Sequence, residues 1–570
     1  MEISLKSQTP SHPGKFPPQL SWDLPLTHLH GCDETRRRCV NRCSARPGTF
    51  FFVARAIACQ YHIMPGSDQG ILDSEEWDEE KLDLNSGWTS AARWEPYWKP
   101  VTSRYRQRRV FGFLRSWLWP SQSSRPKRLH PTAYLDGLRG FAALLVYWHH
   151  HELWAHGSSG QNSIYENSFG YDDNYSMVAF PGIRTFFSGG HYAVSTFFVI
   201  SGYVLSIKPL ALLQSGNLAG LGDHLASSLF RRWIRLYLPL FVAMLFYAMS
   251  WHVLGIWIEA AEPQSNWRDE LWAFYAEFKN FSFVFKEGGV PWLSYNFHLW
   301  SIPAEFRGSI VVYTSIMAFS RCSLVAHLWC QVGLIFYFMY IADGWYCAMF
   351  VAGALIRHLD LLAEKGELPR FLARLDPIKT FIYYHLFALS VFLGGVPSEN
   401  RNLDQLANNR GWYLLSFLKP QAVFDYKWFY LFWAATLLVA SISRIHWLKA
   451  FFETRVCQYL GRVSYALYLV HGPVLWTLGD RLYVATGWHK EEHLEHIPHW
   501  VDKIPLPRTG PLGLEISFLV PHIILLPLTL CLAEFVTRAV DTPSVKFAGW
   551  FYRKTLGERS DDADGKQAKA

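Results

Sequence analysis

Residues 134–154, YLDGLRGFAALLVYWHHHELW, place charged and titratable side chains inside a stretch that is otherwise apolar enough to enter a membrane. If the stretch is helical, Asp136 and Arg139 are spaced to pair on one face at its start. Arg139 and His150 are eleven residues apart. At about 100° per residue they return almost to the same angle, about 16 Å apart along the axis. A guanidinium and an imidazole on one stripe predict a ligand with an anionic end and a reactive end.

The composition is typical of a protein that crosses the membrane several times. Half of the 570 residues are hydrophobic, with 26 Trp, 28 Tyr and 41 Phe, and only 18% are charged. The net charge of +7 is modest, so no nucleic-acid partner is expected. The nine cysteines are scattered and predict neither a disulfide framework nor a zinc knuckle.

The predicted fold is all-α: a polytopic integral membrane bundle of about ten transmembrane helices. Residues 1–130 are rich in Pro, Ser and charge and predict a basic, largely disordered region. Residues 131–545 form the transmembrane domain, and residues 546–570 a polar tail. The expected spans are roughly 134–154, 192–210, 234–258, 299–319, 324–341, 344–358, 378–395, 427–443, 456–478 and 514–537.

The distribution of basic residues predicts that both ends of the chain are cytoplasmic. Connections after the second, fourth, sixth and eighth spans are rich in Lys and Arg, as the positive-inside rule requires of cytoplasmic loops, although the loop 396–426 fits less well. The residues do not decide between the endoplasmic reticulum and the plasma membrane. Asn-x-Ser triplets at Asn174 and Asn280 fall in loops expected on the other side, and they predict a glycoprotein.

Three arginines are the candidates for binding a phosphate-bearing cosubstrate. Arg232 and Arg235 lie one turn apart at the cytoplasmic start of the third span. With Arg139 they would form a cationic mouth, and the arginine fork matches phosphate geometry. The alternative for Arg232 and Arg235 is simple anchoring at the lipid headgroups.

Three further polar residues inside spans are candidates for catalysis. A buried, neutral His150 is able to take a proton from a hydroxyl group. Glu305 has three possible roles: orienting an imidazole, binding an acceptor or pairing with an arginine. His471 is about ten residues inside the ninth span. It is either part of the site or a hydrogen-bonded core histidine.

No metal is expected. The sequence HKEEH at residues 489–493 matches a metalloprotease pattern, but it lies in a polar loop punctuated by proline. The three histidines 149–151 do not share one helix face, so they cannot all bind one ion.

Five blocks in order along the chain resemble the membrane acyltransferase 3 family, and its fungal branch in particular. They are LDGLRGFAALLVYWHHH, FFVISGYVLS, RRWIRLYLPLF, LWSIPAEFRGS and LGRVSYALYLVHGPV. The resemblance implies an enzyme that moves an acyl group, often acetyl, from acyl-CoA to a hydroxyl group. It gives the donor-binding role to Arg139, Arg232 and Arg235 and the catalytic role to His150. Because His149 and His151 flank His150, the identity of the base stays open.

The predicted function is therefore an integral membrane O-acyltransferase in which acyl-CoA is the cosubstrate and His150, Glu305 and His471 serve catalysis. Its partners are membrane lipids, acyl-CoA and a hydroxyl-bearing acceptor, which is a carbohydrate, a lipid or a secondary metabolite. Two alternative functions would have to account for the same features of the sequence. A proton-coupled transporter would use the same buried His, Glu and Arg residues, but the chain lacks paired, interrupted helices in two matching halves. A noncatalytic scaffold would have no use for so many costly buried charges.

Overall fold

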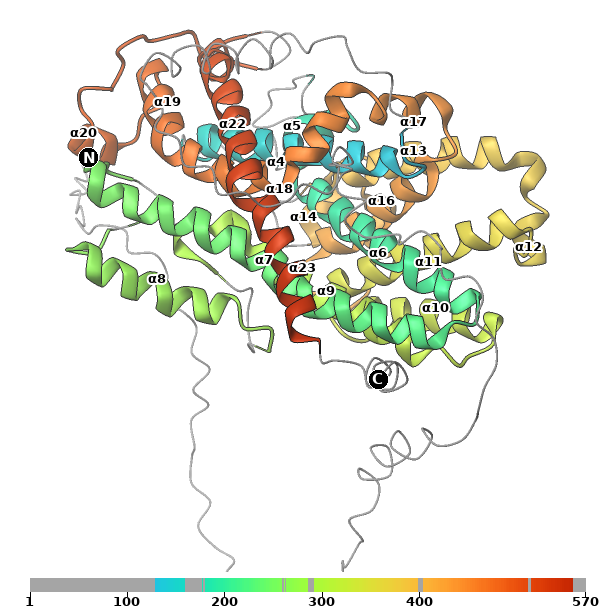
Figure 1. Cartoon of the computed structure of the whole chain (residues 1–570). Helices are drawn as coiled ribbons and strands as arrows, with labels where there is room; N and C mark the ends of the chain where they lie inside the picture. Colours follow the sequence, from blue (N-terminus) through green and yellow to red (C-terminus); the bar gives the residue numbers. More distant parts are fainter. Residues whose placement is uncertain are drawn as a thin grey trace, which may run out of the picture. The chain divides into compact units, whose positions relative to one another are not determined.

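The computed structural model describes residues 129–158, 177, 180–258, 261, 263–285, 292–397, 403–510 and 514–556, all within the unit Trp94–Ala570. Every regular element in these ranges is helical, which confirms the all-α prediction for this part of the chain (Figure 1). The predicted disordered region 1–130 lies outside the described residues except for its last two positions.

A helix occupies each of the ten stretches that the sequence predicts as spans. These helices are α4 (Ala133–Ser158), α6 (Gly190–Gln214), α7 (Leu218–Leu254), α9 (Ser301–Ala318), α10 (Leu324–Tyr340), α11 (Trp345–Lys365), α13 (Lys379–Gly394), α16 (Tyr426–Ile442), α18 (Arg455–Val474) and α22 (His522–Val536). Five helical stretches of the described chain are long and apolar enough to cross a membrane: α6, α7, α11, Asp376–Gly394 and Ile516–Thr555. A sixth is added if Tyr426–Ile442 and His446–Phe452, bent by 98°, form one broken span. A total of ten spans therefore stays a prediction.

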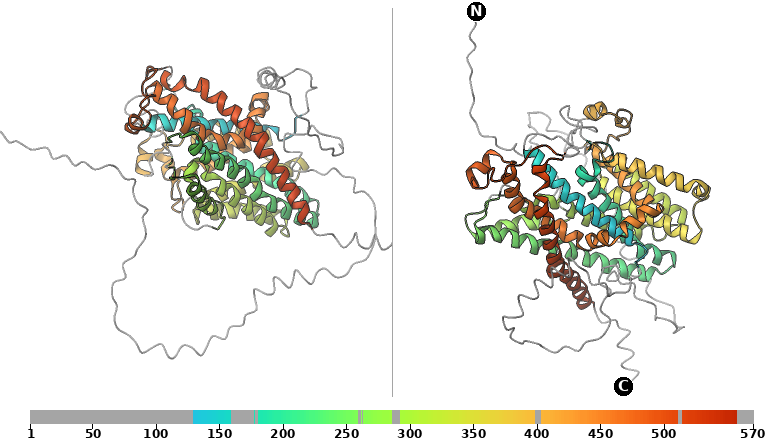
Figure 2. Two further views of the ribbon diagram at one scale, coloured as in Figure 1. Left: turned by 60° about the vertical axis from the view of Figure 1, so that its left-hand side comes forward. Right: turned by 90° about the horizontal axis from the view of Figure 1, so that it is seen from above.

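The remaining helices are mostly short connections and caps. They are α5 (Thr185–Ser188), α8 (Trp267–Phe281), η3 (Ser294–Trp300), α12 (Arg370–Ala373), η4 (Asp376–Ile378), α14 (Leu403–Asn408), α15 (Tyr413–Ser416), α17 (His446–Phe452), η5 (Leu475–Gly479), α19 (Asp480–Thr486), α20 (Glu491–His496), α21 (Ile516–Leu519), η7 (Thr537–Asp541) and α23 (Thr542–Thr555). The region expected as a polar tail from residue 546 begins as helix, because α22 continues through η7 into α23, which packs against α7 (Figure 2).

Helices α4 and α18 lie side by side and parallel, and glycines allow their backbones to touch. A Cβ atom on Gly140 would lie 2.1 Å from the backbone nitrogen of Gly461, and one on Gly137 would lie 1.8 Å from the carbonyl oxygen of Phe452. Such close contact requires glycine, as is common between membrane helices. Helix α6 runs antiparallel along another side of α4, with Gly190 against the ring of His149.

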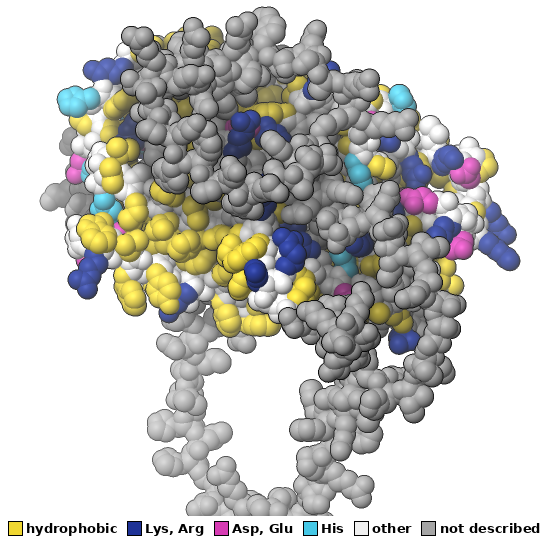
Figure 3. All heavy atoms as spheres, viewed as in Figure 1, with side chains coloured by type: hydrophobic (Ala, Val, Ile, Leu, Met, Phe, Trp, Pro, Cys, Tyr) yellow, Lys and Arg dark blue, Asp and Glu magenta, His cyan; other side chains and the backbone are white. Residues whose placement is uncertain are grey.

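Helix α8 runs back along α7, a feature the sequence did not predict. Glu270, near the start of α8, bonds to His252 near the end of α7 at 3.1 Å. At the other end, Trp233 of α7 donates to the carbonyl oxygen of Ser282 at 3.4 Å. The apolar surface of these two helices is exposed at residues such as Phe246, Val253, Trp267, Trp272 and Tyr275, as a face against lipid would be (Figure 3).

This arrangement bears on the predicted glycosylation. Asn280 lies at the end of α8, two residues before Ser282, and so beside Trp233. The predicted topology puts that end of α7 on the cytoplasmic side, where no glycan is attached. The placement argues against a glycan at Asn280, and Asn174 lies outside the described residues.

Candidate active site

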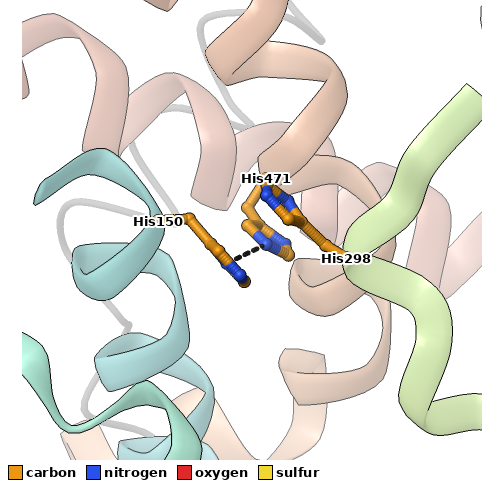
Figure 4. Close-up of side chains that lie close together, drawn as sticks. All are labelled: His150, His298 and His471. Atoms are coloured by element: carbon orange, nitrogen blue, oxygen red, sulfur yellow. Dashed lines mark hydrogen bonds between the residues drawn. The ribbon is translucent and has the colours of Figure 1, made fainter. Parts of the chain in front are cut away.

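Three histidines from distant parts of the chain meet inside the helical bundle (Figure 4). His150 lies on α4, His298 on η3 and His471 on α18. His298 and His471 are buried, and His150 is half-buried. Their possible ligand nitrogens all lie within 4.8 Å of one another, and they are the only such group of His, Cys, Asp or Glu in the described ranges. The structure thus brings His150 and His471 together, and adds a residue that the sequence did not single out.

Hydrogen bonds decide which nitrogen of His150 is free. His471 Nδ1 lies 3.2 Å from the carbonyl oxygen of Leu467, and a carbonyl only accepts, so this nitrogen carries the proton. In a neutral imidazole the other nitrogen, Nε2, is then an acceptor. It lies 2.9 Å from His150 Nδ1, which must therefore be the donor. The lone pair of His150 is left on Nε2, as a general base requires.

His298 is the third member of the cluster. Its ring stacks on that of His150 with centroids 3.5 Å apart. It lies in NFHLW, just before the LWSIPAEFRGS block, where the chain is not regularly helical: Asn296 has φ −162° and ψ 89°. No periodic pattern in the sequence marks this position, so only the fold reveals it.

A small pocket opens beside these rings. Its lining consists of Val146, His149, His150, Gly190, His191, Val194, His298, Trp300 and Tyr468. No Asp, Glu, Lys or Arg is among them.

The pocket lining bears on which of the three consecutive histidines is the candidate base. His151 is absent from the lining, and its Nδ1 bonds to the hydroxyl of Tyr483 at 2.8 Å. His149 does line the pocket, with its Nδ1 3.0 Å from the carbonyl oxygen of Ser188. His150 bonds to another histidine of the cluster, His471.

The donor nitrogens of the cluster are close enough to share a metal ion, but the rings are stacked. The three rings are nearly parallel, with interplanar angles of 17°, 20° and 10°. Because a metal ion lies near the plane of each imidazole that binds it, these stacked rings would have to turn before they could share one ion. The histidines of HKEEH also have separate partners: His489 pairs with Asp502 at 3.3 Å, and His493 with Asp480 at 3.0 Å.

The predicted shared face of Arg139 and His150 is confirmed, since both contact α18. Arg139 donates to the carbonyl oxygen of Gly461 at 3.4 Å and pairs with Asp136 at 3.3 Å. Its side chain keeps 39% of its surface exposed. The guanidinium is therefore accessible at one end of the face that carries His150.

Glu305 lies with the arginines and not with the histidines. It forms an ion pair with Arg232, and the two side chains are only 14% and 15% exposed. Arg139 is close enough to interact with Glu305 electrostatically. Of the three roles open to Glu305, the structure shows the pairing with an arginine. Arg235, one turn after Arg232 on α7, is half-buried.

A second polar cluster lies at the far end of α4. His156 is buried and bridges two carboxylates, with Nδ1 2.7 Å from Glu152 and Nε2 3.2 Å from Glu515. Burial alone would lower the pKa of His156, but the two carboxylates outweigh it and raise this pKa to about 10. His156 is therefore an imidazolium that links the end of α4 to the segment before α21.

Most of the chain is similar to known acyltransferases. The model of a family described as "Acyltransferase domain" matches residues 132–533. The O-acetyltransferase PaAT-1 of Phomopsis amygdali is 29% identical over 494 residues, covering 78% of this chain and 89% of that protein. Acyltransferase clz18 of Cochliobolus lunatus is 22% identical over 486 residues, covering 76% and 97%. No solved structure matches the chain.

Proposed function

Since this chain belongs to the acyltransferase family whose model covers residues 132–533, we propose that it is an integral membrane O-acyltransferase that uses acyl-CoA. The acyl group proposed is acetyl, and its acceptor is a hydroxyl of a carbohydrate, lipid or secondary metabolite. The name of the relative PaAT-1, an O-acetyltransferase, supports both the oxygen acceptor and the acetyl group.

The observation that carries the proposal is the chain of hydrogen bonds from Leu467 through His471 to His150. It fixes His150 in the tautomer whose Nε2 bears the lone pair, beside a pocket without charged side chains. A base held by an orienting partner is the arrangement that general-base catalysis needs. His471 acts on His150 and is therefore a positioning residue.

The proposed reaction balances without any further reactant. His150 Nε2 takes the proton of the acceptor hydroxyl while the oxygen attacks the thioester carbonyl carbon. The tetrahedral intermediate collapses, the C–S bond breaks, and the departing thiolate takes the proton back from His150. The products are an ester and free coenzyme A, and the low water content of the bundle interior protects the thioester from hydrolysis.

The donor's phosphates bind at the arginine end in this proposal. Arg139, Arg232 and Arg235 supply the charge, and Glu305 holds the guanidinium of Arg232 in place. Acyl-CoA enters from the cytoplasm, with both termini on that side of the endoplasmic reticulum or plasma membrane. Membrane lipids surround the apolar faces of the helices.

Acetyl transfer by the detergent-purified protein tests this proposal. Radiolabelled acetyl-CoA is supplied with an organic extract of the source cells, and label is followed into new products. The wild type is expected to transfer label, His150→Ala to transfer none, and His489→Ala, in the HKEEH loop, to match the wild type. Full transfer by His150→Ala would overturn the proposal, as would a wild type that moves solutes across vesicles without using acetyl-CoA.

A further inference from the structure

The backbone of His298 is fixed from both sides by buried polar side chains. Its N–H donates to the side-chain oxygen of Asn296 at 3.2 Å. The hydroxyl of Tyr468 donates to the His298 carbonyl oxygen and accepts in turn from Ser301, whose oxygen lies 2.7 Å away. Asn296 also donates to the carbonyl oxygen of Leu469 on α18 at 3.4 Å. Three buried side chains therefore hold one histidine in position.

The surroundings of the two ring nitrogens of His298 indicate which of them carries the proton. His298 is 4% exposed, and its Nδ1 is buried with no hydrogen-bond partner. This nitrogen faces α18, since a Cβ atom on Gly472 would lie 3.1 Å from it. A bare lone pair without a partner is tolerated more readily than an unpaired N–H. The proton therefore belongs on Nε2, as a donor on a ring that lines the pocket.

We propose that His298 is a catalytic residue that donates a hydrogen bond from Nε2 to the oxyanion of the tetrahedral intermediate. This inference rests on the proposed acyl transfer. As the acceptor oxygen bonds to the carbonyl carbon, the C=O electrons move to oxygen, and the negative charge develops beside His298. When C=O re-forms, the C–S bond breaks and the hydrogen bond weakens again; His298 itself gains or loses no proton.

Because the rings of His150 and His298 are stacked, both can act on the same carbonyl group, one as a base and the other as a hydrogen-bond donor. His150 and His298 are 3.5 Å apart at their centroids, so a carbonyl group presented to one is within reach of the other. The described backbone around the cluster is mostly helical, and N–H groups inside a helix are already bonded. A side-chain donor therefore takes the place that backbone N–H groups fill in many acyl-transfer enzymes.

Two substitutions at one position separate this role from simple packing. His298→Phe keeps an aromatic ring for the stack but has no donor, and His298→Gln keeps an amide N–H near the position of Nε2. In the purified enzyme we expect His298→Phe to lower kcat on the order of 10²-fold with little change in the KM for acetyl-CoA, because the bond forms mainly in the transition state. His298→Gln is expected to recover at least about tenfold of that loss.

The outcomes are distinct for each proposal. A wild-type kcat in His298→Phe, or a loss in His298→Phe that His298→Gln does not reduce, overturns the oxyanion role. Thermal midpoints and acetyl-CoA binding are measured for both variants, so that a loss of kcat caused by misfolding is recognised and left out of the comparison. His150→Ala is assayed in the same series: if it stays active, the acyl-transfer mechanism itself fails, whereas an inactive His150→Ala beside an unaffected His298→Phe rejects His298 alone.

Discussion

At the scale of single residues, the proposed catalysis depends on which nitrogen of His150 lacks a proton. His471 determines this, because its own tautomer is fixed by the carbonyl oxygen of Leu467. Because His471 Nε2 accepts the 2.9 Å hydrogen bond between the two rings, the proton of His150 is on Nδ1. In the proposed reaction, His471 in the ninth predicted span therefore acts through one hydrogen bond to His150.

Replacing His471 should therefore reduce the rate more than substrate binding. We expect His471→Ala to lower kcat on the order of 10²-fold, since His150 loses the acceptor that selects its tautomer. His471→Gln places an amide oxygen near the same position and should retain more activity. Steady-state kinetics with acetyl-CoA, across the pH range, measures both; a kcat of His471→Ala close to that of the wild type would show that His150 needs no orienting partner.

The raised pKa of His156 predicts how the stability of the protein depends on pH. Its pKa is about 10 in the folded protein, against about 6.5 in an unfolded chain. A raised pKa means that the contribution to stability is complete below the unfolded value and is lost as the pH rises through the folded value. The thermal midpoint should thus fall between about pH 7 and pH 10 in the wild type.

The variant His156→Gln has no such proton to lose. Its midpoint should start lower, because Glu152 is left buried without a cation, and should change less over the same pH range. Parallel pH curves for the two proteins would contradict the assigned ion pairs.

The sequence predicted part of this residue-scale account. Helical spacing placed Arg139 and His150 on one face, and both do contact α18. His298 was not predicted, because it follows the break at Asn296 and is brought to the site by tertiary packing. Glu305 had three open roles, because a sequence shows a carboxylate but not which partner lies within reach.

At the scale of helices, the site depends on the close contact of α4 and α18. These two helices carry His150 and His471, and the glycine pair Gly140 and Gly461 sets their separation. Gly140→Ala would place a Cβ atom 2.1 Å from the backbone of Gly461, so the helices must move apart. Backbone atoms cannot yield as a flexible side chain would.

We therefore expect Gly140→Ala to lose activity and to lose about 1–3 kcal/mol of stability. Gly333→Ala is the matched control, because Gly333 is also inside a helix, α10, and a Cβ atom there meets nothing within 4 Å. That variant should keep wild-type activity and a thermal midpoint no lower than the wild type. Equal behaviour of the two variants would show that the α4–α18 contact does not position the site.

Helix positions were the most predictable level of the structure, because long apolar stretches mark them. One helix that this pattern missed is α8, whose apolar residues alternate with Glu270, Glu277 and Lys279 and so give no span-like stretch. Its acids are used internally, for example Glu277, which accepts from the Ser294 hydroxyl at 2.6 Å. Such pairing is invisible in a hydropathy pattern.

At the scale of the whole molecule, the proposal needs the arginine end of the site to face the cytoplasm. Epitope tags at both termini of the chain in sealed microsomes should be digested by external protease, and a tag in the loop between Thr486 and Glu515 should be protected. Asn280→Gln should leave the electrophoretic mobility unchanged, since Asn280 lies beside Trp233, at the end of α7 that the proposal places in the cytoplasm. A protected terminal tag, or a glycan at Asn280, would contradict this orientation.

The claim that one donor molecule extends from Arg139 to His150 is tested most directly by an affinity label. Bromoacetyl-CoA carries an alkylating carbon where the acetyl group of the substrate lies, and attack by a ring nitrogen expels bromide. Peptide mapping by mass spectrometry should find the label on His150, with Arg139→Ala requiring a higher reagent concentration for equal labelling. Label on His149 or His151 instead, or labelling of His150 that is unaffected by Arg139→Ala, would contradict the account.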